Sequence, residues 1–211
     1  LGDDLTNPFL LNPKDSFSDQ QLLQSSDRVG LAKKSEINAW SGPFIMATAN
    51  TRVVRRSEAL LALRQESYGP NFTYQEHAFH KSWFSAFRSL VLTGISVLVL
   101  LSPLKRLVKP FLPKPGEGPS EFVQENGWFD CKFIVETEDG IKSVFNMNGK
   151  GDPGYKVTSK LVSECALCLI EEIDNLPGGS EYGGVLTCAS GLGNPLIARL
   201  RKAGINFTGP L

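Results

Sequence analysis

The chain has 211 residues, of which 41% are hydrophobic and 21% are charged, and this composition is typical of a folded globular protein. Lysine plus arginine and aspartate plus glutamate both number 22, so the net charge of zero gives no support for a nucleic-acid partner. The four cysteines are too few and too scattered for a disulfide framework, which favours a reducing, intracellular compartment, and no metal site is expected.

The first segment, residues 1–38, is polar, and its apolar residues keep no sustained period. Pro8, Pro13 and Gly30 interrupt it, so the segment predicts a linker or an extended arm. Residues 39–82 then begin a folded domain. Within them, residues 40–50 are apolar and small, which predicts a buried strand or loop followed by a helix that starts near Asn50.

Residues 83–111 contain the hydrophobic peak of the sequence, with no charge between Arg88 and Lys105. A helix over this uncharged run rises about 24 Å at ~1.5 Å per residue, which is short of the ~30 Å hydrocarbon core. Aromatic residues precede the run and cationic residues follow it, an arrangement suited to a headgroup layer. We therefore expect an in-plane or re-entrant membrane anchor, the alternative being a helix buried in a core or a dimer interface. The expected membrane-contacting residues are Trp83, Phe87, Leu90, Ile95, Leu98 and Leu101.

Prolines and glycines punctuate residues 112–121, which predict a rigid connector. A C-terminal domain is expected over residues 122–211. Its first elements are two strands of alternating polarity, residues 129–135 and 141–147, joined by a turn at Asp139 and Gly140.

The rest of the C-terminal domain mixes helical and extended patterns. Apolar residues recur at three- and four-residue steps from Val157 to Leu169, which predicts a helix. A strand or extended segment is expected over residues 184–188, a helix over 196–203 with Asn194 as N-cap, and an extended stretch over 205–207. The predicted fold class is α+β, with a mixed sheet, packed helices and one hydrophobic membrane-seeking helix.

Cysteine, histidine and glycine clusters offer little chemistry by themselves. Cys165 and Cys168 lie inside a helical pattern, so core packing is favoured over a redox or zinc half-site. His77 and His80 lack a third ligand nearby and are interpreted as surface or interface residues. The glycine runs do not have the G-x-G-x-x-G spacing of a dinucleotide fingerprint, and no Ser/His/Asp arrangement supports a hydrolase.

Five unusual strings occur in order along the chain: residues 50–57, 112–120, 151–155, 163–169 and 183–187. Together they resemble the C-terminal half of the saccharopine-dehydrogenase-like oxidoreductases, closest to the branch called trans-acting enoyl reductases. The resemblance implies that an N-terminal Rossmann domain, absent from this chain, binds NADP or NAD in the complete protein. It also implies that residues 39–82 begin a domain for substrate binding or association. This chain alone is expected to hold no cofactor.

The resemblance also implies reduction of a carbon-carbon double bond in a long acyl or polyketide-type chain, near a membrane or lipid surface. The implied partners are the missing Rossmann domain or a partner subunit, with self-association into a homo-oligomer. The alternative is a non-catalytic subunit of a membrane assembly that uses the reductase-like fold as an interaction platform.

Site residues are expected in two of these strings. Arg52, Arg55 and Arg56, which follow Asn50, could clamp a phosphate or carboxylate of the cofactor or acyl carrier, because guanidinium groups suit such anions; solvated helix charges are the alternative. Gly151, Asp152 and Gly154 join a strand to a helix and could form part of the site or a structural turn in which the aspartate caps the helix. Tyr155, which follows them, is the expected proton donor.

Overall fold

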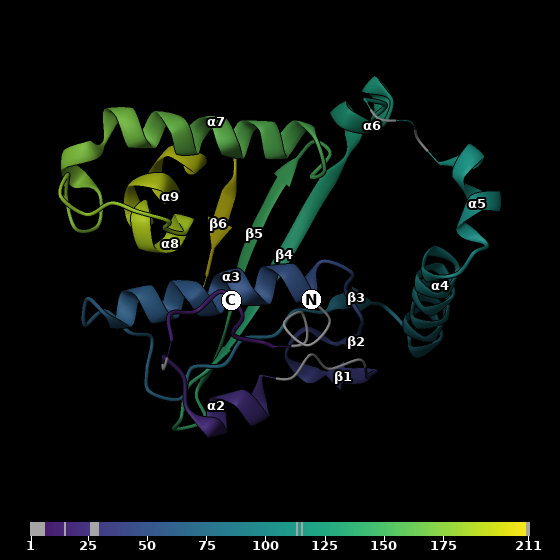
Figure 1. Ribbon diagram of the computed structural model, residues 1–211, viewed down its shortest axis with the longest axis horizontal. Helices are drawn as coiled ribbons and strands as arrows, with labels where there is room; N and C mark the ends of the chain where they lie inside the picture. Colours follow the sequence, from purple (N-terminus) through teal and green to yellow (C-terminus); the bar gives the residue numbers. More distant parts are fainter. Residues whose placement is uncertain (1–6, 15, 26–29, 113, 115, 210–211) are drawn as a thin grey trace. The chain divides into compact units, whose positions relative to one another are not determined.

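The computed structural model describes residues 7–14, 16–25, 30–112, 114 and 116–209. The chain divides into two compact units, Leu1–Leu112 and Pro113–Leu211, and the division falls at the start of the segment rich in proline and glycine. Each unit has its own three-stranded sheet, and each is described by itself (Figure 1).

Unit 1 is built around the antiparallel sheet β1-β2-β3. Trp40 of the central strand pairs with Lys33 on one side and with His80 on the other. The elements of this unit are α2 (Asp19–Gln24), β1 (Ala32–Lys34), η1 (Ser35–Ile37), β2 (Ala39–Gly42), α3 (Ala47–Ala62), β3 (Ala78–His80), α4 (Trp83–Leu101), α5 (Lys105–Val108) and η2 (Lys109–Phe111).

The described part of the first segment is folded onto the rest of unit 1. Phe9 is buried and stacks on Phe17 with ring centroids 4.4 Å apart, and a capping box between Ser18 and Gln21 begins α2. The segment predicted to be a linker or arm therefore contributes an aromatic contact, a short helix and a strand. Elements of three to six residues are too short to show the periodicity by which longer helices and strands are recognised.

The strand expected around Trp40 is confirmed as β2, but the helix after it begins earlier than predicted. Helix α3 starts at Ala47 rather than near Asn50, with Met46 at the N-cap position and no side-chain cap. A helix start without Ser, Thr, Asp or Asn carries no sequence signal, which explains the difference.

Helix α4 has 19 residues, more than the uncharged run alone. Ser82 caps the start of this helix, because its side chain accepts a hydrogen bond from the backbone amide of Ser85. The helix ends at Leu101, before Pro103. Its first turns lie against β2 and β3, where Ala86 is completely buried.

Unit 2 has the antiparallel sheet β4-β5-β6. The predicted hairpin is confirmed: its two long strands pair along their whole length, and Gly140 in the turn has a φ of 82°. The elements of this unit are α6 (Glu121–Asn126), β4 (Trp128–Glu136), β5 (Lys142–Lys150), α7 (Lys156–Glu171), η3 (Ile173–Asn175), α8 (Cys188–Gly191), α9 (Gly193–Lys202) and β6 (Asn206–Thr208).

The core of unit 2 lies between the sheet and helices α7 and α9, which cover one face of it (Figure 1). The predicted helix from Val157 is confirmed as α7. Its buried residues Val157 and Cys168 join side chains from α9 and from the chain before β6. The buried members of this core are Val157, Cys168, Leu176, Leu192, Leu196, Leu200 and Ile205.

Three expectations for the C-terminal region are corrected. The described chain has two small antiparallel sheets instead of one mixed sheet, although the combination of helices and sheets agrees with the α+β class. Residues 184–188 do not pair as a strand, because Thr187 and Ser190 form a capping box that begins α8 at Cys188. Helix α9 starts at Gly193, before the expected N-cap Asn194.

Candidate functional site

The predicted site residues fall into two groups on different units. Asn50, Arg52 and Arg55 belong to α3 in unit 1, whereas residues 151–155 lie between β5 and α7 in unit 2. Each group is therefore considered within its own unit.

Arg52 and Arg55 are both buried rather than solvated. Arg55 is 2% exposed and donates to the carbonyl oxygens of Pro8 (3.0 Å) and Tyr74 (2.8 Å), and its guanidinium lies over the Phe9 ring. Arg52 is 4% exposed and donates to the Thr51 hydroxyl at 3.1 Å. The interpretation of these two residues as solvated helix charges is wrong, because their guanidinium groups lie in the packing of α3.

A polar cluster forms where α3 meets the chain before β3. Asn50 Nδ2 donates to Glu76 Oε2 at 2.8 Å, and the Tyr74 hydroxyl donates to Glu76 Oε1 at 3.0 Å. A carboxylate that receives hydrogen bonds from an amide and a phenol is fixed in orientation, and the phenol and carboxylate together can hold and exchange a proton. We call Asn50, Tyr74 and Glu76 the Glu76 cluster.

The sequence analysis found Asn50 but missed Tyr74 and Glu76. These two residues lie two apart in the extended chain before β3, a spacing that directs both side chains to the same side. The spacing of Tyr74 and Glu76 was the sequence signal for this cluster, but an alternation of two residues is too short to distinguish from chance.

The loop from Gly151 to Tyr155 is held in place by backbone hydrogen bonds. Gly151 donates to the carbonyl of Gly127 (2.7 Å), and Asp152 donates to that of Gln124 (2.9 Å). The Asp152 carboxylate accepts from the amide of Tyr155 at 2.7 Å, so it closes the turn that enters α7. Tyr155 itself is exposed, with its ring beside Gly118. The loop is thus a structural turn, as foreseen in the alternative, but Asp152 closes the turn and does not cap the helix, because the N-cap position of α7 is Tyr155, which has no side-chain cap. The loop also presents the Tyr155 phenol to solvent.

Gly127, which follows α6, lies directly against this loop and leaves no room for a side chain. A Cβ there would lie 2.7 Å from the backbone nitrogen of Asp152 and 2.9 Å from the carbonyl of Val123, and neither backbone atom can rotate away. We expect Gly127→Ala to lower the free energy of unfolding of unit 2 by about 1–3 kcal/mol, the usual range for overpacking. Urea denaturation measures this loss.

The matched control is Gly183→Ala, because a Cβ at Gly183 meets nothing within 4 Å. This variant should unfold at the wild-type urea concentration or slightly above it, since alanine restricts the unfolded chain. Equal midpoints for both variants would contradict the proposed tightness of the loop.

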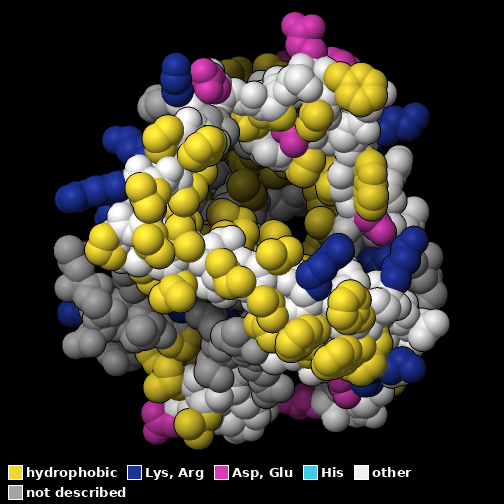
Figure 2. Space-filling model, turned by 90° about the vertical axis from the view of Figure 1, so that its right-hand side faces the viewer, with side chains coloured by type: hydrophobic (Ala, Val, Ile, Leu, Met, Phe, Trp, Pro, Cys, Tyr) yellow, Lys and Arg dark blue, Asp and Glu magenta, His cyan; other side chains and the backbone are white. Residues whose placement is uncertain are grey.

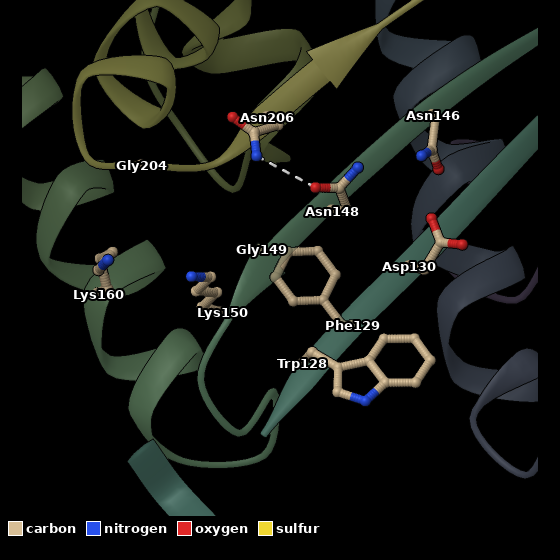
Figure 3. Close-up of a pocket in the computed structure, with 10 residues that line it drawn as sticks. All are labelled: Trp128, Phe129, Asp130, Asn146, Asn148, Gly149, Lys150, Lys160, Gly204 and Asn206. Atoms are coloured by element: carbon tan, nitrogen blue, oxygen red, sulfur yellow. Dashed lines mark hydrogen bonds between the residues drawn. The ribbon is translucent and has the colours of Figure 1, made fainter. Parts of the chain in front are cut away.

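A groove of about 580 Å³ lies at the edge of sheet β4-β5-β6, where the short β6 leaves the end of β5 uncovered (Figure 3). Asn206 Nδ2 donates to Asn148 Oδ1 at 3.2 Å, and Lys160 from α7 donates to the Ala203 carbonyl at 2.9 Å. These amide and ammonium groups, together with the aromatic side chains of Trp128 and Phe129, give the groove a mixed polar and apolar lining. Its lining comprises Trp128, Phe129, Asp130, Asn146, Asn148, Gly149, Lys150, Lys160, Gly204 and Asn206.

Helix α4 presents a large apolar surface. Within the described residues, it is the helix that is long and apolar enough to cross a membrane by length and composition. Five of the expected membrane residues are exposed, whereas Leu90 is half-buried. Figure 2, which looks from the α4 side, shows hydrophobic side chains gathered on this face with lysines and arginines around them. The exposed five are Trp83, Phe87, Ile95, Leu98 and Leu101.

Two of the cysteines pack in or against the core of unit 2, whereas Cys131 and Cys188 are exposed. Cys168 is completely buried in the core of unit 2, as expected, and Cys165 packs against that core. His80 lies with Nδ1 3.4 Å from the hydroxyl of Ser85. In the part of the chain that the structure describes, no three His, Cys, Asp or Glu side chains are placed to hold a metal ion.

These features define an α+β protein of two units, with a polar cluster on one unit, a hydrogen-bonded loop and a groove on the other, and one exposed apolar helix. No family model matches the chain, and no solved structure matches it significantly. It is similar to a putative trans-acting enoyl reductase of Mycobacterium tuberculosis, with 36% identity over 216 residues that cover 96% of this chain and 50% of the relative. Trans-acting enoyl reductases of Mycobacterium bovis and Mycobacterium ulcerans are 34% and 33% identical over 174 residues, which cover 79% of this chain and 40% of each relative.

The chain thus has homologues named trans-acting enoyl reductase, the branch that the five strings resemble. It spans about half the length of the curated relatives it matches.

Proposed function

We propose that this chain is the substrate-binding and association part, corresponding to the C-terminal half, of a saccharopine-dehydrogenase-like enoyl reductase that acts on lipid or polyketide-type acyl chains. The observation that carries the proposal is the similarity to proteins named trans-acting enoyl reductase over 96% of the chain. The reductase uses NADP or NAD, which is the usual hydride source for such a reaction.

The described residues do not fit the pyrophosphate of a nicotinamide cofactor. A dinucleotide is normally held where a strand enters a helix through a Gly-rich turn in a parallel βαβ unit, but both sheets of the described chain are antiparallel. Gly178 and Gly179 instead form a turn after η3, with φ values of 81° and 67°. The proposal therefore assigns cofactor binding to another domain or subunit and derives no hydride step from this chain.

What this chain can supply is binding and a proton. Reduction of an enoyl group adds hydrogen to two neighbouring carbons, and one of these arrives as a proton from a positioned acid. The exposed phenol of Tyr155 is the proposed donor, and the phenol and carboxylate of the Glu76 cluster are a second source. Of the other predicted residues, Arg55 donates to the carbonyl of Tyr74, a member of the Glu76 cluster, and the backbones of Gly151 and Asp152 hold the loop that precedes Tyr155.

Helix α4 supports the lipid part of the proposal. Its first turns are held against sheet β1-β2-β3 at Ala86, so about 20 Å of helix, from Ser89 to Leu101 at ~1.5 Å per residue, extends beyond that contact. This length is too short to cross a ~30 Å hydrocarbon core but suits an in-plane or re-entrant anchor. Such an anchor would keep the protein beside an apolar substrate.

One observation favours the alternative, a non-catalytic interaction platform in a membrane assembly. Arg55 and Asp152, both in strings that resemble those of the family, use their side chains to hold this chain together. A protein that kept these strings for folding alone would need neither a substrate nor a cofactor.

Kinetics with the complete natural protein test the proposal. We expect it to oxidise NADPH or NADH when given an enoyl thioester, and we expect Tyr155→Phe to lower kcat at least 10-fold with unchanged cofactor affinity, because general acids contribute about 10²–10⁴-fold. Tyr68→Phe is the matched control, since both tyrosines are 56% exposed, and it should keep wild-type turnover. If the complete protein binds neither nicotinamide cofactor, the reductase proposal is wrong and the protein is the non-catalytic interaction platform.

A further inference from the structure

Two cysteine side chains that are distant in sequence meet in unit 2. The Sγ atoms of Cys165, in the middle of α7, and Cys188, the first residue of α8, are 4.0 Å apart. A disulfide requires about 2.05 Å between the sulfur atoms, so the pair is roughly 2 Å from bonding distance. The two thiols are thus in contact, close enough for a small rearrangement to bring them to bonding distance.

Both backbones are held in position by packing. The capping box between Thr187 and Ser190 fixes the start of α8, and Ser190 and Leu192 behind it are buried. Helix α7 is tied to α9 by Arg199, which donates to the carboxylates of Glu164 at 3.0 Å and Glu171 at 2.6 Å. The proximity of the two sulfur atoms therefore follows from the core of the unit.

The cysteines of this region differ in their access to a reagent. Cys188 is exposed, Cys165 is half-buried, and Cys168, one turn further along α7, is completely buried. Burial, together with the neighbouring Cys188, raises the pKa of Cys165 to about 11. Because Cys188 is exposed, it is the thiol that reacts first with a reagent from solvent. The half-buried Cys165 is then placed to form the disulfide with Cys188.

We propose that Cys165 and Cys188 are a reversible modification site that forms an intramolecular disulfide by exchange with a small-molecule disulfide. The Cys188 thiolate attacks one sulfur of the reagent, breaks its S–S bond and releases one small thiol. The Cys165 thiolate then attacks Sγ of Cys188 and releases the second small thiol. The two protein thiols are oxidised by two electrons and lose two protons, and the reagent is reduced to two thiols.

The bond closes a loop that contains η3 and the glycine-rich turn after it. Gly178, Gly179 and Gly184 in this loop have positive φ values, and Val185 is among the most exposed apolar residues of the described chain. Cross-linking its ends removes conformational freedom from the unfolded chain and restricts opening of the loop in the folded one. Oxidation therefore makes unit 2 more stable, and reduction releases the loop.

Equilibration of the full chain with reduced and oxidised glutathione tests this site. We expect the intact mass to fall by two hydrogen atoms, peptide mapping to join Cys165 to Cys188, and the thermal midpoint of unit 2 to rise by about 5 °C or more. Cys188→Ser should abolish all three effects, and Cys131→Ser, which removes an exposed cysteine on β4, should abolish none.

Other products overturn the proposal. A stable glutathione adduct on Cys188 without ring closure would show that Cys165 does not reach it, and an intermolecular bond through Cys131 would place the reactive thiol elsewhere. Because Cys188 is exposed, Cys188→Ser should fold even if Cys165→Ser does not. The comparison of Cys188→Ser with Cys131→Ser therefore decides whether the disulfide forms as proposed.

Discussion

Arg55→Ala is expected to lower the free energy of unfolding of unit 1 by about 3–5 kcal/mol, since hydrogen bonds to a charged group each contribute roughly 1.5–3 kcal/mol. The substitution removes the donors to the carbonyl oxygens of Pro8 and Tyr74 and the cation that lies 5.5 Å from the Phe9 ring centroid. Two carbonyl groups in the packing of α3 would then lose these partners. Urea denaturation followed by near-ultraviolet circular dichroism measures the loss.

The adjacent arginine provides the matched control. Arg56 donates to the carbonyl of Leu11 from a more exposed position, so Arg56→Ala should cost about 1 kcal/mol or less. Arg55→Lys should fall between the two, because an ammonium group keeps the charge but not the planar fork that reaches both carbonyls. If Arg55→Ala unfolds with the wild-type midpoint, the arginine is not a structural anchor and its interpretation as an anion clamp regains support.

Leu98→Glu is expected to weaken binding of the chain to phospholipid vesicles by about 10-fold or more. The substitution exchanges a side chain worth roughly 1.5–3 kcal/mol on burial for a carboxylate that costs up to ~3 kcal/mol in hydrocarbon. Leu98 is 69% exposed on the part of α4 that extends beyond sheet β1-β2-β3. Flotation with vesicles measures the bound fraction.

Leu63→Glu is the control for this experiment, because Leu63 is 72% exposed but lies at the end of α3. It should leave vesicle binding unchanged. Binding should also weaken with salt when the vesicles contain anionic lipid, since Lys105, Arg106 and Lys109 follow α4. Equal flotation of both variants, or no binding by the wild-type chain, would identify α4 as an interface helix that another protein covers.

Much of unit 2 could be predicted because its elements carry local patterns. The strands on either side of Gly140 alternate in polarity over part of their length, and α7 repeats its apolar residues at helical spacing over four turns. Unit 1 was predicted less well. Its strands have three or four residues, and α3 starts without a capping side chain, so little local signal exists.

The candidate sites were also predicted only in part from the sequence. The sequence pointed to Asn50 and Tyr155 through strings that resemble those of a family, but it did not pair Asn50 with Glu76, which lies 26 residues further along the chain. It placed Cys165 in a helix but treated it as core, because Cys188 is 23 residues away with no pattern linking the two. Contacts over such separations depend on how the elements pack.

The sequence by itself determined the hairpin, helix α7, the apolar helix α4 and the resemblance to enoyl reductases, because each rests on residues that are neighbours in the chain or in a linear string. Only the tertiary structure decided that Arg55 is buried against the N-terminal segment, that Tyr74 and Asn50 share the Glu76 carboxylate, and that Cys165 meets Cys188. The physical reason is that burial and side-chain contact depend on packing between distant segments, whereas periodicity records only the face that each element turns toward a core.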